Sequence, residues 1–199
     1  MGASHTHSGG PLSGLCADDV VDAPELVRDL ALNHSTIRDT LYEEWVIRQI
    51  ATAVVEADRR REPVTLSVGT GKEDAAVFNR RLRMKDGRSC SHPGKGNPDI
   101  LDYAGPIDPD VGVVAAWRSD GALVGCIVNY ACHGTTAPGG ISADWIYYLE
   151  NTITGAMGGN PVTVFLNGAC GDITQVDNLC QTERESGEKY ARLVGGRVG

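Results

Sequence analysis

Three histidines are the residues of this chain whose type and spacing most directly suggest chemistry. His5 and His7 lie two residues apart in SHTHSGG, and His133 follows an apolar run in NYACHGTT. Side chains at positions i and i+2 of an extended backbone project from the same face, so one segment can present both imidazoles to one site. Neutral imidazole is a common zinc ligand, and a catalytic zinc takes about three protein ligands. The pattern predicts a zinc site with His133, while a flexible amino-terminal tail is the alternative for the pair.

The other candidates are a hydroxyl, a carboxylate and a guanidinium. Thr174 follows a glycine turn in NGACGDIT, where its hydroxyl could act as a nucleophile, donate to a substrate or stabilise the turn. Asp172 could orient a ligand histidine or cap the loop. Arg80, in FNRRLR, could bind a carboxylate or an oxyanion, although a salt bridge is the usual role. The two remaining histidines, His34 and His92, are interpreted as surface residues.

The first half of the chain must position these residues through helices, a strand and a loop. Residues 23–33 predict a short helix, and a longer one follows, capped by Ser35 or Thr36 and stopped by Pro63. Residues 64–71 are β-branched and end in glycines, which indicates a strand. Residues 85–110 are rich in Gly, Pro, Asp and Ser, and we expect a long surface loop there, a kind of segment that is often functional.

The second half alternates strands and helices. Two apolar runs flank Asp120-Gly121, which predicts a hairpin. Ser142 is the expected cap of a helix over 143–157, and residues 161–172 read as a buried strand that leads into a glycine loop. A last helix is expected to begin near Thr182. The inward side chains expected on these two helices are Trp145, Leu149, Ile153, Met157, Tyr190, Leu193 and Val194.

This order of elements predicts an α/β layered domain with a mixed β-sheet flanked by helices. The hairpin is expected to be antiparallel and the strand–helix–strand segment around 124–167 parallel. Ligands of such domains gather beyond the carboxyl ends of the strands. If those ends coincide, His5, His7 and His133 share one pocket with Asp172 and Thr174.

Composition and charge exclude several classes of protein. The chain has 199 residues, 41% of them hydrophobic and 22% charged, as in ordinary globular domains. Its net charge of −8 argues against a nucleic-acid partner, because no basic stripe would neutralise phosphates. No apolar stretch reaches the ~18–20 residues of a transmembrane helix, and no signal peptide is visible. The six cysteines lack the spacing of a zinc ribbon.

Five motifs in register resemble the amino-terminal catalytic region of the neutral/alkaline ceramidase family. They are SHTHSGG, FNRR, NYACHGTT, ISADW and FLNGACGDIT, and together they extend over nearly the whole chain. The family pattern reads roughly T-H-T-H-S-G-P, N-R, a strand ending in A-x-H, a serine-aspartate helix start, and G-D-V-S-P-N. The family consists of zinc amidohydrolases that cleave the N-acyl bond of ceramide, a sphingolipid. The resemblance therefore implies a Zn²⁺-dependent hydrolase acting on a linear amide.

The resemblance also implies a role for each matching residue. His5 and His133 would be zinc ligands, and His7 would stand beside the metal as a hydrogen-bonding or acid–base group. Arg80 would line the active site, and Thr174 takes the place of the catalytic serine. Zinc would lower the pKa of bound water and polarise the amide carbonyl, while His7 and Arg80 stabilise the oxyanion. A lipid or other small N-acyl substrate follows, and a secreted or periplasmic location is suggested.

The chain departs from the family pattern at several points. An additional glycine precedes the proline of the first motif, and GDITQVDN replaces the S-P-N ending. The family's remaining zinc ligands, a glutamate and a tyrosine, lie further along than this chain extends. We therefore expect residues 1–199 to be a partial catalytic domain, truncated at both ends and not a competent enzyme alone.

Two alternatives to a zinc amidohydrolase stay open. The first is a non-catalytic lipid- or glycan-binding module that retains the fold. The second is a serine-hydrolase-like enzyme that uses Thr174, which ranks last because no G-x-S-x-G elbow exists. The true substrate and the oligomeric state are not encoded in any pattern of the sequence.

Overall fold

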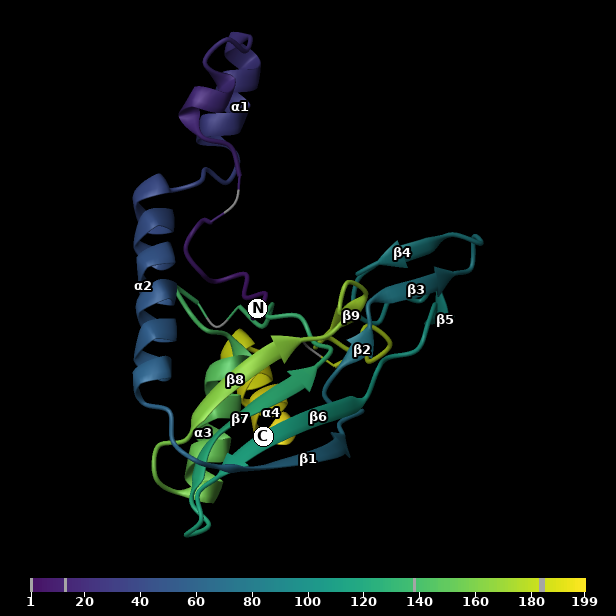
Figure 1. The fold of residues 1–199 in the computed structure, drawn as a ribbon. Helices are drawn as coiled ribbons and strands as arrows, with labels where there is room; N and C mark the ends of the chain where they lie inside the picture. The colour runs from purple at the N-terminus through teal and green to yellow at the C-terminus, as the bar shows by residue number, and fades with distance from the viewer. Residues whose placement is uncertain (1, 13, 138, 183–184) are drawn as a thin grey trace. The chain divides into compact units, whose positions relative to one another are not determined.

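The structure is a computed structural model that describes residues 2–12, 14–137, 139–182 and 185–199. It divides the chain into two compact units, one of Met1–Ser8 with Val64–Gly199 and the other of Gly9–Pro63 (Figure 1). Each unit is described by itself. Within the described ranges, no helix combines the length and the apolar character that crossing a membrane requires.

The smaller unit contains the two helices expected in the first half of the chain. Its elements are η1 (Ala17–Val20), α1 (Glu25–Asn33) and α2 (Thr40–Arg59). The expected cap of α2 at Ser35 or Thr36 is wrong, because Asp39 is the N-cap. Its Oδ1 accepts from the backbone N–H groups of Leu41 and Tyr42 at 3.0 Å each. Ile37 forms a bridge with Leu15, and this extended pairing keeps the preceding residues out of the helix.

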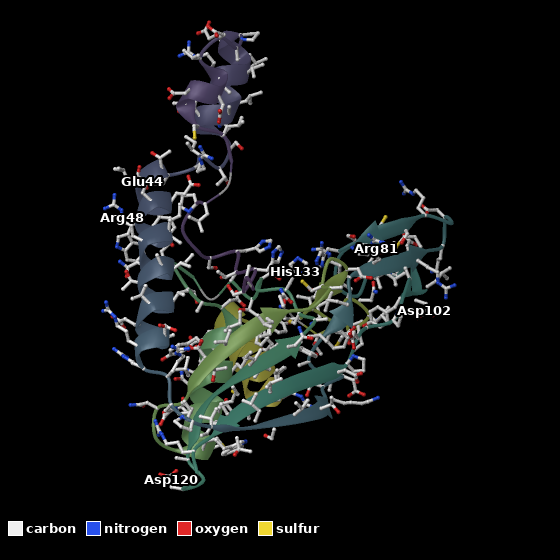
Figure 2. All side chains as sticks on the ribbon, viewed as in Figure 1. Glu44, Arg48, Arg81, Asp102, Asp120 and His133 are labelled. Atoms are coloured by element: carbon white, nitrogen blue, oxygen red, sulfur yellow. The ribbon has the colours of Figure 1, made fainter. Side chains whose placement is uncertain are left out.

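The larger unit is built on a four-stranded mixed sheet. Its strands, in spatial order, are β1 (Thr65–Lys72), β6 (Asp110–Trp117), β7 (Leu123–Tyr130) and β8 (Val162–Asn167). β6 pairs antiparallel with both β1 and β7, and β8 runs parallel to β7 after the crossover helix α3 (Trp145–Met157). The turn between β6 and β7 contains Asp120, labelled in Figure 2, and Gly121 with φ of +84°. The predicted hairpin, parallel pair and layered α/β fold are confirmed.

Two helices, α3 and α4 (Gly187–Val198), cover one face of this sheet (Figure 1). Trp145 and Leu149 of α3 are fully buried against the sheet, and the Trp145 ring meets Phe165 edge-on at 4.8 Å between centroids. Val194 of α4 joins the same core, whereas Leu193 is 46% exposed and does not point inward as expected. Met157, at the end of α3, is also exposed. The core therefore lies between the sheet and the two helices.

The beginnings of these helices differ from the sequence predictions. Asp144, and not Ser142, is the N-cap of α3, because its side chain accepts from the Trp145 N–H while the Ser142 Oγ accepts from the Asp144 N–H. The α4 helix begins at Gly187, later than the expected Thr182, with Ser186 as its N-cap. Ser142 lies two residues before the true N-cap of α3, and Ser is a common N-cap residue, so the sequence pattern suggested Ser142 as the cap.

The segment expected to be one long loop, 85–110, contains two short strands instead. The three-stranded antiparallel sheet β4-β3-β5 consists of β3 (Arg81–Met84), β4 (Ser89–Ser91) and β5 (Ile100–Tyr103). A further two-stranded sheet joins β2 (Phe78–Asn79) to β9 (Ile173–Thr174). Strands of two to four residues contain too few alternations to stand out among the surrounding Gly and Pro. The expectation of one long surface loop over residues 85–110 is therefore wrong.

Candidate metal centre

Three imidazoles meet beyond the carboxyl end of β7. His5 and His7 come from the amino-terminal segment. His133, labelled in Figure 2, comes three residues after β7 ends. The ring centroids of His5 and His133 are 4.7 Å apart, and one ligand nitrogen of each of the three rings lies within 4.8 Å of the others. The Nε2 atoms of His5 and His7 are 3.2 Å apart. Residues more than 120 positions apart in the sequence thus form one histidine cluster.

A close backbone approach docks the amino-terminal segment beside His133. Thr6 forms a parallel bridge with Gly134, and the His7 N–H donates to the Gly134 carbonyl at 2.9 Å. A Cβ atom at Gly134 would lie only 2.9 Å from both the His5 carbonyl oxygen and the Thr6 Cα, so a side chain there would displace the segment. Glycine at this position therefore allows His5 and His7 to reach the end of β7.

The loop before α3 holds the same segment from its other side. The Thr6 hydroxyl donates to the Ser142 carbonyl at 3.0 Å, and the Ser142 N–H donates to the Ser8 carbonyl at 2.9 Å. Asp144, which is fully buried, accepts from the Thr136 hydroxyl at 2.7 Å. This carboxylate joins the loop after His133 to the start of α3, a role that the sequence analysis did not assign although ISADW contains the residue.

The burial of His133 determines its protonation. The ring is 4% exposed and its Nδ1 has no hydrogen-bond partner among the described residues. Burial, followed by the positive charge of Arg80, lowers the pKa of His133 below its ordinary value, so the ring is neutral at pH 7. Its carbonyl accepts from Trp145 Nε1 at 2.9 Å and from the Gln175 amide. A neutral, buried nitrogen with no partner has the properties of a metal ligand.

Gln175 is a second residue that the sequence analysis did not identify. Its side chain is 3% exposed and its Nε2 donates to the His133 carbonyl, while its Oε1 accepts from the Thr135 hydroxyl at 3.2 Å. The amide therefore joins the loop after β9 to the loop that carries His133. A buried glutamine next to Thr174 is the sequence signal that could have identified it.

Arg80 and Thr174 are brought together by the two-stranded sheet β2–β9. Phe78 pairs with Thr174, and the Arg80 N–H donates to the Asp172 carbonyl at 2.7 Å. The Asp172 carboxylate accepts from Asn79 Nδ2 at 2.9 Å, so its hydrogen-bond partner is an amide and not a ligand histidine. Thr174 is 3% exposed, and its hydroxyl accepts from the Val176 N–H at 3.2 Å, which stabilises the turn.

A cavity of about 450 Å³ adjoins this cluster. Its lining includes three of the predicted site residues, namely His7, Arg80 and Thr174. His92, which is exposed as expected of a surface residue, lines it too, and the length of the segment around it was the signal of a functional role. His34, by contrast, belongs to the smaller unit and contacts Asp29 at 3.4 Å.

The fold is similar to part of two solved ceramidases. A ceramidase described as complexed with C2 matches with a TM-score of 0.70 and 23% identity over 99% of this chain and 28% of its own. The neutral ceramidase from Pseudomonas aeruginosa matches with a TM-score of 0.69 and 23% identity over 98% of this chain and 29% of its own. No protein-family model matches the sequence, and no curated protein matches it either. This chain thus spans less than a third of either enzyme and has the fold of that part of a neutral ceramidase.

Proposed function

We propose that this chain supplies part of the active site of a zinc-dependent amidohydrolase that cleaves the N-acyl bond of a linear, ceramide-like amide. The observation that carries the proposal is the meeting of His5, His7 and His133 beside a cavity that contains Arg80 and Thr174. The ceramidase-like fold supports the same reaction class. Because the chain spans 28–29% of those enzymes, we infer that it contributes only some of the groups of a complete site.

The donor set fits zinc. Two nitrogens bound at ~2.0–2.1 Å to one tetrahedral zinc lie roughly 3.3 Å apart. The Nε2 atoms of His5 and His7 are 3.2 Å apart, a distance that suits either two ligands or a hydrogen bond between neutral rings. His7 lines the cavity, and neither His5 nor His133 is among the cavity-lining residues. We therefore assign the ligand role to His5 and His133, and a role facing the substrate to His7.

When bound, zinc supplies a Lewis acid that polarises an amide carbonyl and lowers the pKa of water. The remaining steps belong to the chain. His7 is placed to accept a proton from the attacking group and to return it to the departing amine. The Arg80 guanidinium offers N–H donors to the oxygen that becomes negative as the carbonyl is attacked. The Thr174 hydroxyl, in the position of the family serine, is placed to donate a hydrogen bond to the reacting group.

Zinc titration of the 199-residue chain against a chromophoric chelator tests this proposal. We expect about one zinc per chain, the number expected for one mononuclear site. In His133→Ala the affinity should fall by more than the roughly 10–100-fold that loss of an outer-shell partner costs. His34→Ala is the matched control and should bind zinc as the unsubstituted chain does. Zinc binding that His133→Ala leaves unchanged, or no binding even at roughly millimolar free metal, where two histidine ligands suffice for a weak site, would instead favour a non-catalytic binding module.

A further inference from the structure

The cavity next to the histidine cluster is lined by the guanidinium-bearing residue Arg80. Arg80 is half-buried, its backbone N–H donates to the Asp172 carbonyl, and its carbonyl accepts from the His92 N–H. Its side chain has no ion pair or hydrogen bond among the residues that the structure describes. A guanidinium that faces a cavity without a counter-charge can pair with an anionic ligand through charge-assisted hydrogen bonds.

The surroundings of Arg80 are polar and basic. The described lining of the cavity holds a second cation, Lys95, and the amide, hydroxyl and imidazole groups of Asn178, Thr135 and His92, with no acidic side chain among these residues. Val176 is the one aliphatic side chain in that described lining. Such walls offer several hydrogen-bond donors for an anion.

The carboxylates on the same segment are engaged by other donors. Asp172 accepts from Asn79 at 2.9 Å, and Asp177 accepts from the Tyr103 hydroxyl at 2.7 Å. Neither of these two carboxylates is therefore paired with the Arg80 guanidinium.

We propose that the cavity binds a carboxylate carried by the substrate, and that the substrate class is an N-acyl amino acid and not a neutral ceramide. The inference rests on the proposed amidohydrolase function. A planar guanidinium presents five N–H donors, which suffice for a bidentate carboxylate and for a neighbouring oxyanion. Arg80 would then set specificity by holding the carboxylate of the amine portion while the scissile amide lies toward His7 and Thr174.

The test compares N-acetylglycine with N-acetylethanolamine, a neutral analogue that replaces the carboxylate by a hydroxymethyl group. NMR titrations of the zinc-free full chain should give a dissociation constant about tenfold lower for N-acetylglycine, equivalent to 1.4 kcal/mol. Acetate, which lacks the amide, should bind more weakly than N-acetylglycine. In Arg80→Gln the preference for N-acetylglycine should disappear. In Arg80→Lys part of the preference should remain, because lysine keeps the positive charge but lacks the planar pair of N–H donors that binds a carboxylate bidentately.

Arg81→Gln is the matched control, since Arg81 is the adjacent, exposed arginine and is not among the lining residues (Figure 2). It should keep the full preference. Equal affinity for the two ligands in the unsubstituted chain, acetate binding as tightly as N-acetylglycine, or loss of the preference in both variants would overturn the inference. The zinc titration is independent of these measurements: preference without zinc binding would refute the hydrolase proposal alone, and zinc binding without preference would refute the carboxylate site alone.

Discussion

At the scale of single residues, the candidate site depends on a glycine that carries no chemistry. Gly134 lets the backbone of Thr6 pair directly beside the end of β7, so that His5 comes within 4.7 Å of His133 between ring centroids. An atom added at this glycine would lie 2.9 Å from two backbone atoms, and backbone cannot yield as the end of a side chain can. The spacing of the imidazoles is thus set by main-chain packing.

We expect Gly134→Ala to weaken zinc binding, because the added methyl group would displace the segment that carries His5. The expected loss of affinity is about tenfold or more, which corresponds to at least 1.4 kcal/mol. Gly155→Ala is the control, since no atom lies within 4 Å of the added methyl in the last turn of α3. That control should bind zinc normally and raise the free energy of unfolding by roughly 0.5–1 kcal/mol. Chelator titration and chemical unfolding measure the two effects. Unchanged zinc affinity in Gly134→Ala would contradict the docking role of this glycine.

At the scale of elements, the small sheet β4-β3-β5 is anchored to the segment that follows Thr174. The Tyr103 hydroxyl, at the end of β5, donates to Asp177 Oδ1 at 2.7 Å. Burial, followed by this hydrogen bond and the negative charge of Asp177, raises the pKa of Tyr103. The contact therefore holds the two segments that carry Lys95 and Asn178 along the cavity.

The raised pKa has a defined consequence for stability. Because the folded-state pKa of Tyr103 lies above the unfolded value of about 10, its contribution is complete below pH ~10 and is lost as the pH rises toward the folded-state pKa. Tyr103→Phe should lower the free energy of unfolding by about 1 kcal/mol at pH 8, and the difference should narrow by pH 11. Tyr147→Phe, at an exposed tyrosine of α3, should have little effect at either pH. A deficit in Tyr103→Phe that stays constant across this range would refute the titration argument.

Sequence patterns predicted the larger elements because those elements repeat their signal over many residues. The hairpin β6–β7 has two eight-residue strands around an Asp-Gly turn, and α3 buries apolar residues at helical spacing. The short strands β2 and β9 gave no such signal, yet they align Arg80 with Thr174. Their pairing joins residues more than 90 positions apart, and a single sequence does not contain that information.

The sequence predicted the histidines of the candidate site but not the buried polar residues that hold the surrounding loops in place. The histidine pair and His133 stood out because imidazoles at i and i+2 are chemically distinctive. Gln175 and Asp144 did not, since a buried amide or carboxylate is distinguished only by the backbone groups that surround it. His92 is exposed, as the sequence interpretation expected, but its loop-like composition concealed the strands that bring it to the cavity.

At the scale of the whole molecule, an acidic chain contains a cavity lined by basic side chains. The net charge is −8, whereas the described lining of the cavity contains Arg80 and Lys95 and no carboxylate. An anionic ligand is therefore repelled by the chain as a whole and attracted at one place, which favours local recognition over general binding. The candidate metal centre adjoining that cavity is the feature on which the proposed chemistry depends.

The most direct test of that centre follows the ¹⁵N imidazole resonances of the five histidines during a zinc titration. The account predicts that the signals of His5 and His133 shift together and saturate at one zinc per chain, the stoichiometry of a shared ion. The signal of His34, in the smaller unit, should not move. Zinc binding that leaves the His133 resonance unchanged would contradict the account.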